Sequence, residues 1–138
     1  MANKGILISV VDDDSSLRNA IKRLINSIGL NVEGFASAEE FLGSGCYEDS
    51  ACLILDVRLP GMSGMELHSR LIAANYRLPI IFISGHGDGD LRSQALEAGA
   101  VEFLQKPFSE QAMFNALYLS LAMRNGDAFD TPDPVSSF

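Results

Sequence analysis

Asp56 occupies a position from which a carboxylate could do chemistry. It ends an apolar run at residues 52–55, and a Pro-Gly pair follows at residues 60–61. A carboxylate can act as a nucleophile toward phosphorus and form an aspartyl phosphate. Such a transfer depends mainly on positioning and on stabilising charge on the transferred oxygens. The alternative is a structural aspartate that accepts hydrogen bonds from the N–H groups of the following loop.

Three other apolar runs also end in polar side chains that could serve this reaction. They are three consecutive aspartates, a serine and a lysine: Asp12, Asp13, Asp14, Ser84 and Lys106. If the ends of the four runs lie together, Asp56 has acidic neighbours, a hydroxyl donor and a positive charge around it. Taken singly, the lysine could be a solvated surface residue and the serine a turn cap.

The three consecutive aspartates exceed what helix capping requires. One such side chain can accept hydrogen bonds from the first N–H groups of a helix, and Asp14, Ser15 or Ser16 suits that role. Neighbouring carboxylates raise each other's pKa, and a divalent cation relieves that cost. Carboxylates are ligands for hard ions such as Mg²⁺. Asp12 and Asp13 therefore predict a metal site near Asp56.

The elements that must position these residues follow from the alternation of apolar runs with segments of helical period. This alternation is typical of a parallel α/β sheet. We predict five strands, near residues 5–11, 31–35, 51–56, 79–84 and 101–105. Capping signals and Gly stops place helices between and after them, and we expect residues 43–50 to be a surface loop. Ligands of such sheets bind beyond the carboxyl ends of the strands, where the strand order switches direction.

The length and composition limit the classes of protein that the chain can belong to. Its 138 residues and 47 % hydrophobic content suit one domain with a sizeable core. The net charge of −8 argues against direct binding of nucleic acid or an anionic membrane. We find no apolar run of about 20 residues and no signal-peptide pattern. Cys46 and Cys52 form no metal-ligand pattern, so we expect reduced thiols and a cytoplasmic protein.

Four segments resemble motifs of the receiver domain of bacterial two-component response regulators. They are Val11-Asp12-Asp13, residues 55–64, residues 83–85 and residues 99–108. The resemblance covers residues 5–125, so we expect a receiver domain over residues 1–125. Residues 126–138 would be a flexible tail or the start of a linker. The stretch 82–88 is most similar to the FixJ-type subgroup, whose receivers often precede a helix-turn-helix domain.

The resemblance implies a fold and a role for each polar residue. The fold would be flavodoxin-like, with five helices around a doubly wound sheet of strand order 2-1-3-4-5. Asp56 would accept a phosphoryl group from the phosphohistidine of a sensor histidine kinase or a phosphotransfer protein. Ser84 and Lys106 would contact the phosphoryl oxygens. Asp13 and Asp56 would bind Mg²⁺ or Mn²⁺ directly, and Asp12 would act largely through water. The backbone carbonyl of Arg58 would complete the protein ligands.

The resemblance also implies how the signal leaves the site. Ser84 would move toward the phosphoryl group and Phe103 could then rotate inward. The Lys106–Pro107 peptide, beside these switch residues, is expected to be cis. The readout surface would be the helix near residues 88–98, the strand that follows it and the last helix, with a phosphorylation-enhanced dimer as one outcome.

Two further residues would tune the lifetime of the aspartyl phosphate. Arg58 and His86 lie two residues after Asp56 and Ser84, where the family varies the rate of phosphoryl loss. The alternative for both is a loop side chain that faces solvent. The resemblance implies a signalling protein that catalyses its own phosphorylation and dephosphorylation, rather than a conventional enzyme.

Two other functions compete with this one. Asp12, Asp14 and Ser16 can be read as the Asp-x-Asp-x-Ser motif of the haloacid-dehalogenase superfamily. The chain is short for that fold, and Asp56 would then have no role. The other is a degenerate receiver that binds partners without phosphorylation, although competent residues occupy every motif position.

Overall fold

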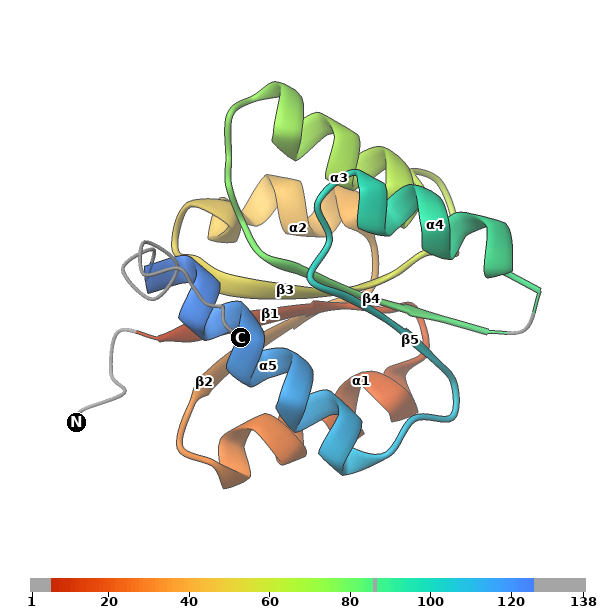
Figure 1. The fold of residues 1–138 in the computed structure, drawn as a ribbon. Coiled ribbons are helices and arrows are strands. Elements are labelled where there is room, and N and C mark those ends of the chain that lie inside the picture. The colour runs from red at the N-terminus through yellow and green to blue at the C-terminus, as the bar shows by residue number, and fades with distance from the viewer. Residues whose placement is uncertain (1–5, 86, 126–138) are drawn as a thin grey trace, which may run out of the picture.

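The computed structural model describes residues 6–85 and 87–125, in which five strands alternate with five α-helices (Figure 1). The strands are β1 (Leu7–Val11), β2 (Asn31–Phe35), β3 (Ser50–Asp56), β4 (Ile80–Ser84) and β5 (Glu102–Gln105). The helices are α1 (Ser15–Ser27), α2 (Ala38–Ser44), α3 (Gly64–Ala73), α4 (Gly89–Glu97) and α5 (Glu110–Asn125).

All neighbouring strands pair in parallel, in the order β2-β1-β3-β4-β5. The predicted flavodoxin-like fold is therefore confirmed. Helices α1 and α5 cover one face of the sheet, and α2, α3 and α4 cover the other (Figure 1). The chain moves from β1 outward to β2 and then crosses to β3 on the other side of β1. The carboxyl ends of β1 and β3 thus form the switch point of the sheet.

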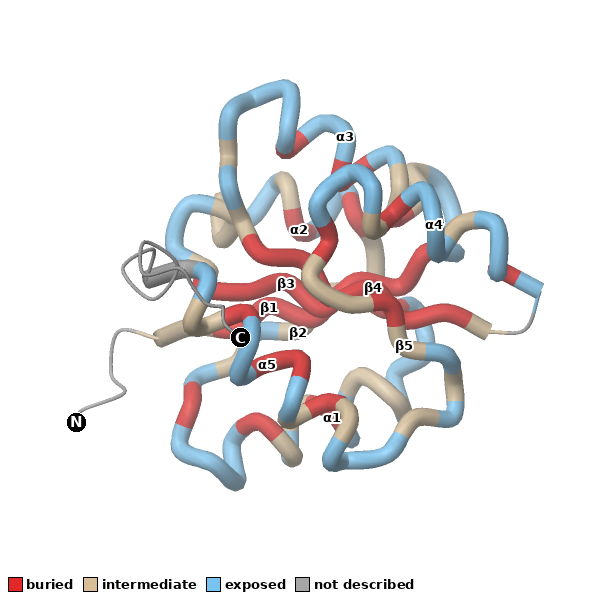
Figure 2. The backbone as a smooth tube through the Cα atoms, in the orientation of Figure 1, coloured by how far each residue is buried: buried red, intermediate tan, exposed pale blue. Residues whose placement is uncertain are grey.

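The two central strands carry almost continuous apolar sequence because helices cover both of their faces. In β4 every residue is buried, and in β3 only Ser50 is partly exposed (Figure 2). Edge strand β2 has no fully buried residue. The core therefore divides into two apolar layers, one on each side of the sheet. Strands β3 and β4 lie between these layers, which hold their carboxyl ends in place.

The starts of α1, α2, α3 and α5 follow the capping signals of the sequence. Asp14 accepts hydrogen bonds from the N–H groups of Ser16 and Leu17, and so caps α1. Ser37, Ser63 and Ser109 each accept one from the N–H three residues later. Side-chain caps of this kind satisfy N–H groups that the helix itself leaves unpaired.

The expected surface loop at residues 43–50 is only partly correct. Helix α2 continues to Ser44, and a short 3-10 helix (η1, Cys46–Glu48) precedes β3. Gly45 joins the two with a left-handed φ of 76°, which glycine adopts without steric cost. The ring of Tyr47 packs edge-on against Phe41 and Tyr76, and this aromatic contact orders a segment that looks polar in sequence.

Within residues 6–85 and 87–125, no helix combines the length and the apolar character needed to cross a membrane.

Candidate functional site

The strand register brings the sequence-predicted residues to one edge of the sheet. Asp56 is the last residue of β3 and pairs in register with Ile83, next to Ser84 at the end of β4. Asp12 directly follows β1, and Lys106 directly follows β5. Because parallel strands place their carboxyl ends side by side, four segments that are distant in sequence meet here.

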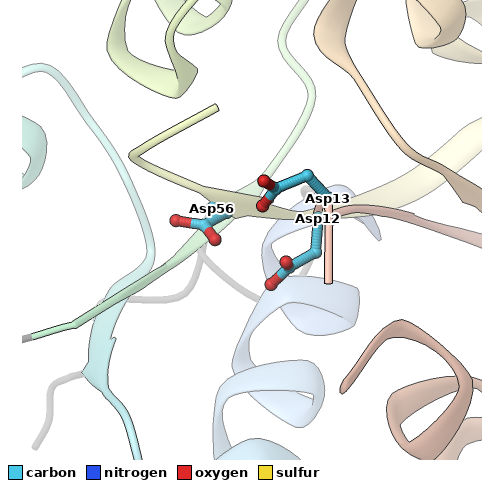
Figure 3. Close-up of side chains that lie close together, drawn as sticks. All are labelled: Asp12, Asp13 and Asp56. Carbon is cyan, nitrogen blue, oxygen red and sulfur yellow. The ribbon is translucent and has the colours of Figure 1, made fainter. Parts of the chain in front are cut away.

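Three carboxylates form a cluster at this edge. Asp12, Asp13 and Asp56 each offer an oxygen, and these oxygens lie within 4.8 Å of one another (Figure 3). Asp12 and Asp56 are buried, whereas Asp13 is exposed. Asp12 Oδ1 accepts a hydrogen bond from the N–H of Asp14 at 2.8 Å. Asp12 Oδ2 is buried and has no hydrogen-bond partner in the described part of the chain.

Lys106 provides the counter-charge. Its Nζ donates a hydrogen bond to Asp56 Oδ2 at 2.9 Å and forms an ion pair with Asp12 Oδ2 at 3.4 Å. Burial raises the pKa of Asp12 to about 6, and the charge of Asp56 adds to this rise against the opposing effects of the Asp14 N–H and Lys106. Burial lowers the pKa of Lys106, but the hydrogen bond to Asp56 and the charge of Asp12 outweigh it, so the net pKa is raised. The lysine therefore stays protonated between the carboxylates.

These residues fit a hard divalent cation. The donors are carboxylate oxygens, which suit Mg²⁺ or Mn²⁺. Asp12 Oδ2 has an ion pair with Lys106 but no hydrogen bond among the described residues, and the pKa of Asp12 is raised, so a nearby cation would stabilise this carboxylate. Arg58 lies beside the cluster because its N–H donates to Asp56 Oδ1 at 2.9 Å. The role of its carbonyl as a metal ligand remains a prediction.

Ser84 and Phe103 border a cavity of about 240 Å³ next to the cluster, together with the start of α4. The buried Ser84 hydroxyl donates weakly, at 3.3 Å, to the carbonyl of Gly85. The ring of Phe103 is already buried and lies 6.1 Å from that of Phe82, centroid to centroid. Phe103 is thus already in a buried orientation, and its rotation on phosphorylation remains a prediction. The Lys106–Pro107 peptide is cis, as expected.

The two residues expected to tune the phosphoryl lifetime differ in what can be said of them. His86 lies outside the described residues. The side chain of Arg58 is 68 % exposed, yet its guanidinium is not simply solvated: Nε donates to Asp88 Oδ1 at 2.9 Å, and Nη2 contacts the same oxygen. Arg58 is thus an exposed loop side chain that also forms an ion pair, and its effect on the phosphoryl lifetime remains a prediction.

Two contacts around the site were missed from sequence. One is the Arg58–Asp88 ion pair, and the other is a hydrogen bond from the N–H of Met62 to Glu39 Oε2 at 2.9 Å. The second contact ties α2 to the loop between β3 and α3. Both join positions on different loops and helices, so no spacing rule reveals them. The signal in the sequence was an acidic residue a few positions after a strand: Glu39 after β2 and Asp88 after β4.

The fold and the position of the site at the switch point define a receiver-type signalling domain. The family model described as response regulator receiver domain matches residues 8–118. Nodulation protein W of Bradyrhizobium diazoefficiens is 44 % identical over 116 residues, which are 84 % of this chain and 51 % of that protein. Transcriptional regulatory protein FixJ of Azorhizobium caulinodans is 40 % identical over 114 residues, 83 % of this chain and 54 % of that protein.

A solved structure of the response regulator StyR matches with a TM-score of 0.83 and 42 % identity, covering 91 % of this chain and 64 % of that one. The chain belongs to the family of response regulator receiver domains, which act in two-component signalling, and its relatives include FixJ-type proteins. It spans about half the length of the curated relatives that it matches.

Proposed function

We propose that this chain is a phosphorylation-dependent receiver that accepts a phosphoryl group on Asp56. The donor would be the phosphohistidine of a sensor histidine kinase or phosphotransfer protein in the cytoplasm. The observation that carries the proposal is the position of Lys106 Nζ, 2.9 Å from Asp56 Oδ2, within an acidic cluster at the switch point. The working unit would be residues 1–125, with residues 126–138 as a tail or linker.

The chemistry is one displacement at phosphorus. An Asp56 carboxylate oxygen forms a bond to phosphorus as the phosphorus–nitrogen bond of the donor breaks, and the imidazole nitrogen keeps the electron pair. Lys106 offsets the charge on the phosphoryl oxygens, and the Ser84 hydroxyl can donate to one of them. Bound Mg²⁺ or Mn²⁺, held by Asp12, Asp13 and Asp56, would supply charge neutralisation at these oxygens. Water attack on the same phosphorus regenerates the free carboxylate.

The proposed output surface is formed by α4, β5 and α5. Arg92 in α4 donates a hydrogen bond from Nη1 to the carbonyl of Phe103 in β5 at 2.8 Å. A shift of either element would therefore strain or break this hydrogen bond. Tyr118 on α5 is 80 % exposed and Leu119 is 48 % exposed. Exposed apolar side chains on this face favour a contact with an output partner or a second copy. Relatives named as transcriptional regulators indicate that such an output would control transcription.

Labelling with a small acyl phosphate tests the proposal. Wild-type protein incubated with acetyl phosphate and Mg²⁺ should acquire one acid-stable, base-labile phosphoryl group, visible as a retarded band on a phosphate-affinity gel. Asp56→Asn should remove the label, and a chelator should remove it from the wild type. Asp14→Asn, which changes the exposed cap of α1, is the matched control and should label normally. Wild-type labelling of Asp56→Asn would refute the proposal, and label mapped to Asp12 would favour the hydrolase.

The output surface has its own test. Sedimentation velocity with and without beryllofluoride, a phosphoryl analogue, should show a larger dimer fraction with the analogue. Tyr118→Ser should reduce that increase, because it removes an exposed ring from the proposed contact. Equal monomer fractions in both conditions would rule out the phosphorylation-enhanced dimer while leaving phosphorylation of Asp56 intact.

A further inference from the structure

A single residue, Arg58, connects the proposed phosphoacceptor to the start of α4. Its backbone N–H donates to Asp56 Oδ1, and its guanidinium holds Asp88, the residue before α4. The two partners of this ion pair differ in solvent exposure. The Arg58 side chain is 68 % exposed, whereas that of Asp88 is 1 % exposed. Arg58 has open space on its solvent side, whereas the Asp88 carboxylate can change partner only within the protein.

Asp88 stands at a helix-cap position without capping its helix. At Asp14, Ser37 and Ser63 the backbone is extended, with ψ between 106° and 165°, and each side chain accepts a hydrogen bond from its helix. Asp88 has φ −104° and ψ 24° and makes no side-chain cap bond. Its Oδ1 is taken by Arg58, and its buried Oδ2 has no hydrogen-bond partner among the described residues.

The two uses of the Asp88 carboxylate compete. A capping residue normally has an extended backbone and accepts from the second or third N–H of the helix. Asp88 could reach that arrangement only if its backbone changed and its carboxylate turned from Arg58 toward α4. A buried carboxylate that lost Arg58 without another donor would be strongly destabilised. If the ion pair were lost, the first N–H groups of α4 would be the nearest replacement donors, and the backbone change needed to reach them would move the start of that helix.

From this geometry we infer that Asp88 is a positioning residue for Arg58. It holds the guanidinium away from Asp56 in the unphosphorylated chain. A phosphoryl group on Asp56 offers arginine several new acceptor oxygens, next to the backbone of Arg58. Arg58 then exchanges Asp88 for the phosphoryl group, and the released carboxylate caps α4. This inference rests on the proposed function and adds a route from Asp56 to α4.

The affinity for beryllofluoride in saturating Mg²⁺, measured by isothermal titration calorimetry, tests the exchange. Asp88→Asn weakens the ion pair with Arg58 and keeps a good cap residue. It should therefore shift the population toward the conformation that the phosphorylated protein adopts. We expect a dissociation constant roughly fivefold lower than that of the wild type, within the usual range of coupling between sites. Asp88→Ala releases Arg58 but cannot cap, and should give a smaller decrease.

The controls separate positioning from a general loss of charge or stability. Asp90→Asn removes the same charge from the exposed first turn of α4, where the described residues offer no ion pair, and should leave the affinity within about twofold. In an Arg58→Ala background, Asp88→Asn should have no further effect. Asp88→Ser, another neutral cap residue, provides a second variant if Asp88→Asn folds poorly in thermal melting.

Three outcomes would overturn the inference. They are an unchanged affinity in both Asp88→Asn and Asp88→Ser, an equal gain in the Arg58→Ala background, and an equal gain in Asp90→Asn. If Asp88→Ala gains as much as Asp88→Asn, the capping step is wrong. Failure of the wild type to bind the analogue or to label at Asp56 would instead refute the proposed function itself.

Discussion

Lys106 Nζ lies 2.9 Å from Asp56 Oδ2, although 50 positions separate the two residues in the chain. The contact reaches from the end of β5 across the end of β4 to the end of β3. The same nitrogen lies 3.4 Å from Asp12 Oδ2. Lys106 thus places a positive charge beside two of the carboxylates that we expect to bind a divalent cation.

Removal of this charge should strengthen the binding of Mg²⁺. We predict that Lys106→Met lowers the dissociation constant for Mg²⁺ by roughly fivefold, because repulsion between two cations a few ångströms apart costs about 1 kcal/mol even in a water-like environment. The same variant should lose output from phosphorylation, since the phosphoryl oxygens lose their counter-charge. Calorimetric titration with MgCl₂ measures the first effect.

The control for Lys106→Met is Arg23→Gln, which removes one positive charge from an exposed position of α1. It should leave the Mg²⁺ affinity within about twofold because exposed charges are screened beyond a Debye length of about 10 Å. If Lys106→Met binds Mg²⁺ more weakly than the wild type, the lysine supports the cation site and this electrostatic prediction is wrong.

Gly64, the first residue of α3, is predicted to tolerate no side chain. A Cβ at this position would lie 2.2 Å from the carbonyl oxygen of Asp56 and 3.0 Å from Val57 Cα. Backbone must shift to relieve such contacts, so Gly64→Ala should lower the free energy of unfolding by about 2 kcal/mol and reduce labelling of Asp56. Gly43→Ala, in α2 with nothing within 4 Å of its Cβ, should be neutral or stabilising by about 0.5 kcal/mol. Equal urea midpoints for the two variants would contradict this steric argument.

The lifetime of the aspartyl phosphate should depend on Arg58 and His86. Both follow proposed site residues by two positions, and Arg58 contacts Asp56 through its N–H. Replacing either with Ala should change the rate at which water reaches and attacks the phosphorus by roughly threefold or more, an effect of about 0.7 kcal/mol on the barrier. Loss of radioactive label from purified phosphoprotein measures that rate. Unchanged decay in both variants would show that neither side chain controls access to the phosphoryl group.

Acidification should destabilise the fold through His68, which is not part of the acidic cluster. Its buried ring packs edge-on against Phe82, and burial lowers its pKa below the usual 6.5. As pH falls through 6.5 the unfolded chain takes up a proton that the folded chain does not, so the free energy of unfolding decreases. Asp12, whose pKa is raised to about 6, acts in the opposite sense, because its stabilising contribution is lost as pH rises through that value.

A comparison of variants isolates the histidine. Urea unfolding at several pH values between 5 and 8 should show a shallower loss of stability on acidification in His68→Leu than in the wild type. Only the difference between the two curves matters, so a constant cost of the substitution does not affect the result. Parallel curves would mean that His68 is already free to take up a proton in the folded state.

The sequence alone determined the class of fold and the identity of the chemically competent residues. Alternating apolar runs and helical segments specify a parallel sheet, because strands covered on both faces need continuous apolar sequence, and β3 and β4 have it. Polar residues at the ends of those runs, Asp56 and Ser84 among them, must then lie at one edge. Local capping signals such as Asp14 were also readable, since a cap depends only on neighbouring residues.

Only the tertiary structure decided how these residues engage one another. Sequence predicts an exposed Arg58, but its pairing with Asp88 depends on how α4 sits against the loop after β3. The burial of Asp12 and the contacts of Lys106 with both Asp12 and Asp56 likewise depend on packing from both faces of the sheet. Sequence periodicity reports which side of an element is buried. Contacts between loops depend on distances among several packed elements, which no local pattern encodes.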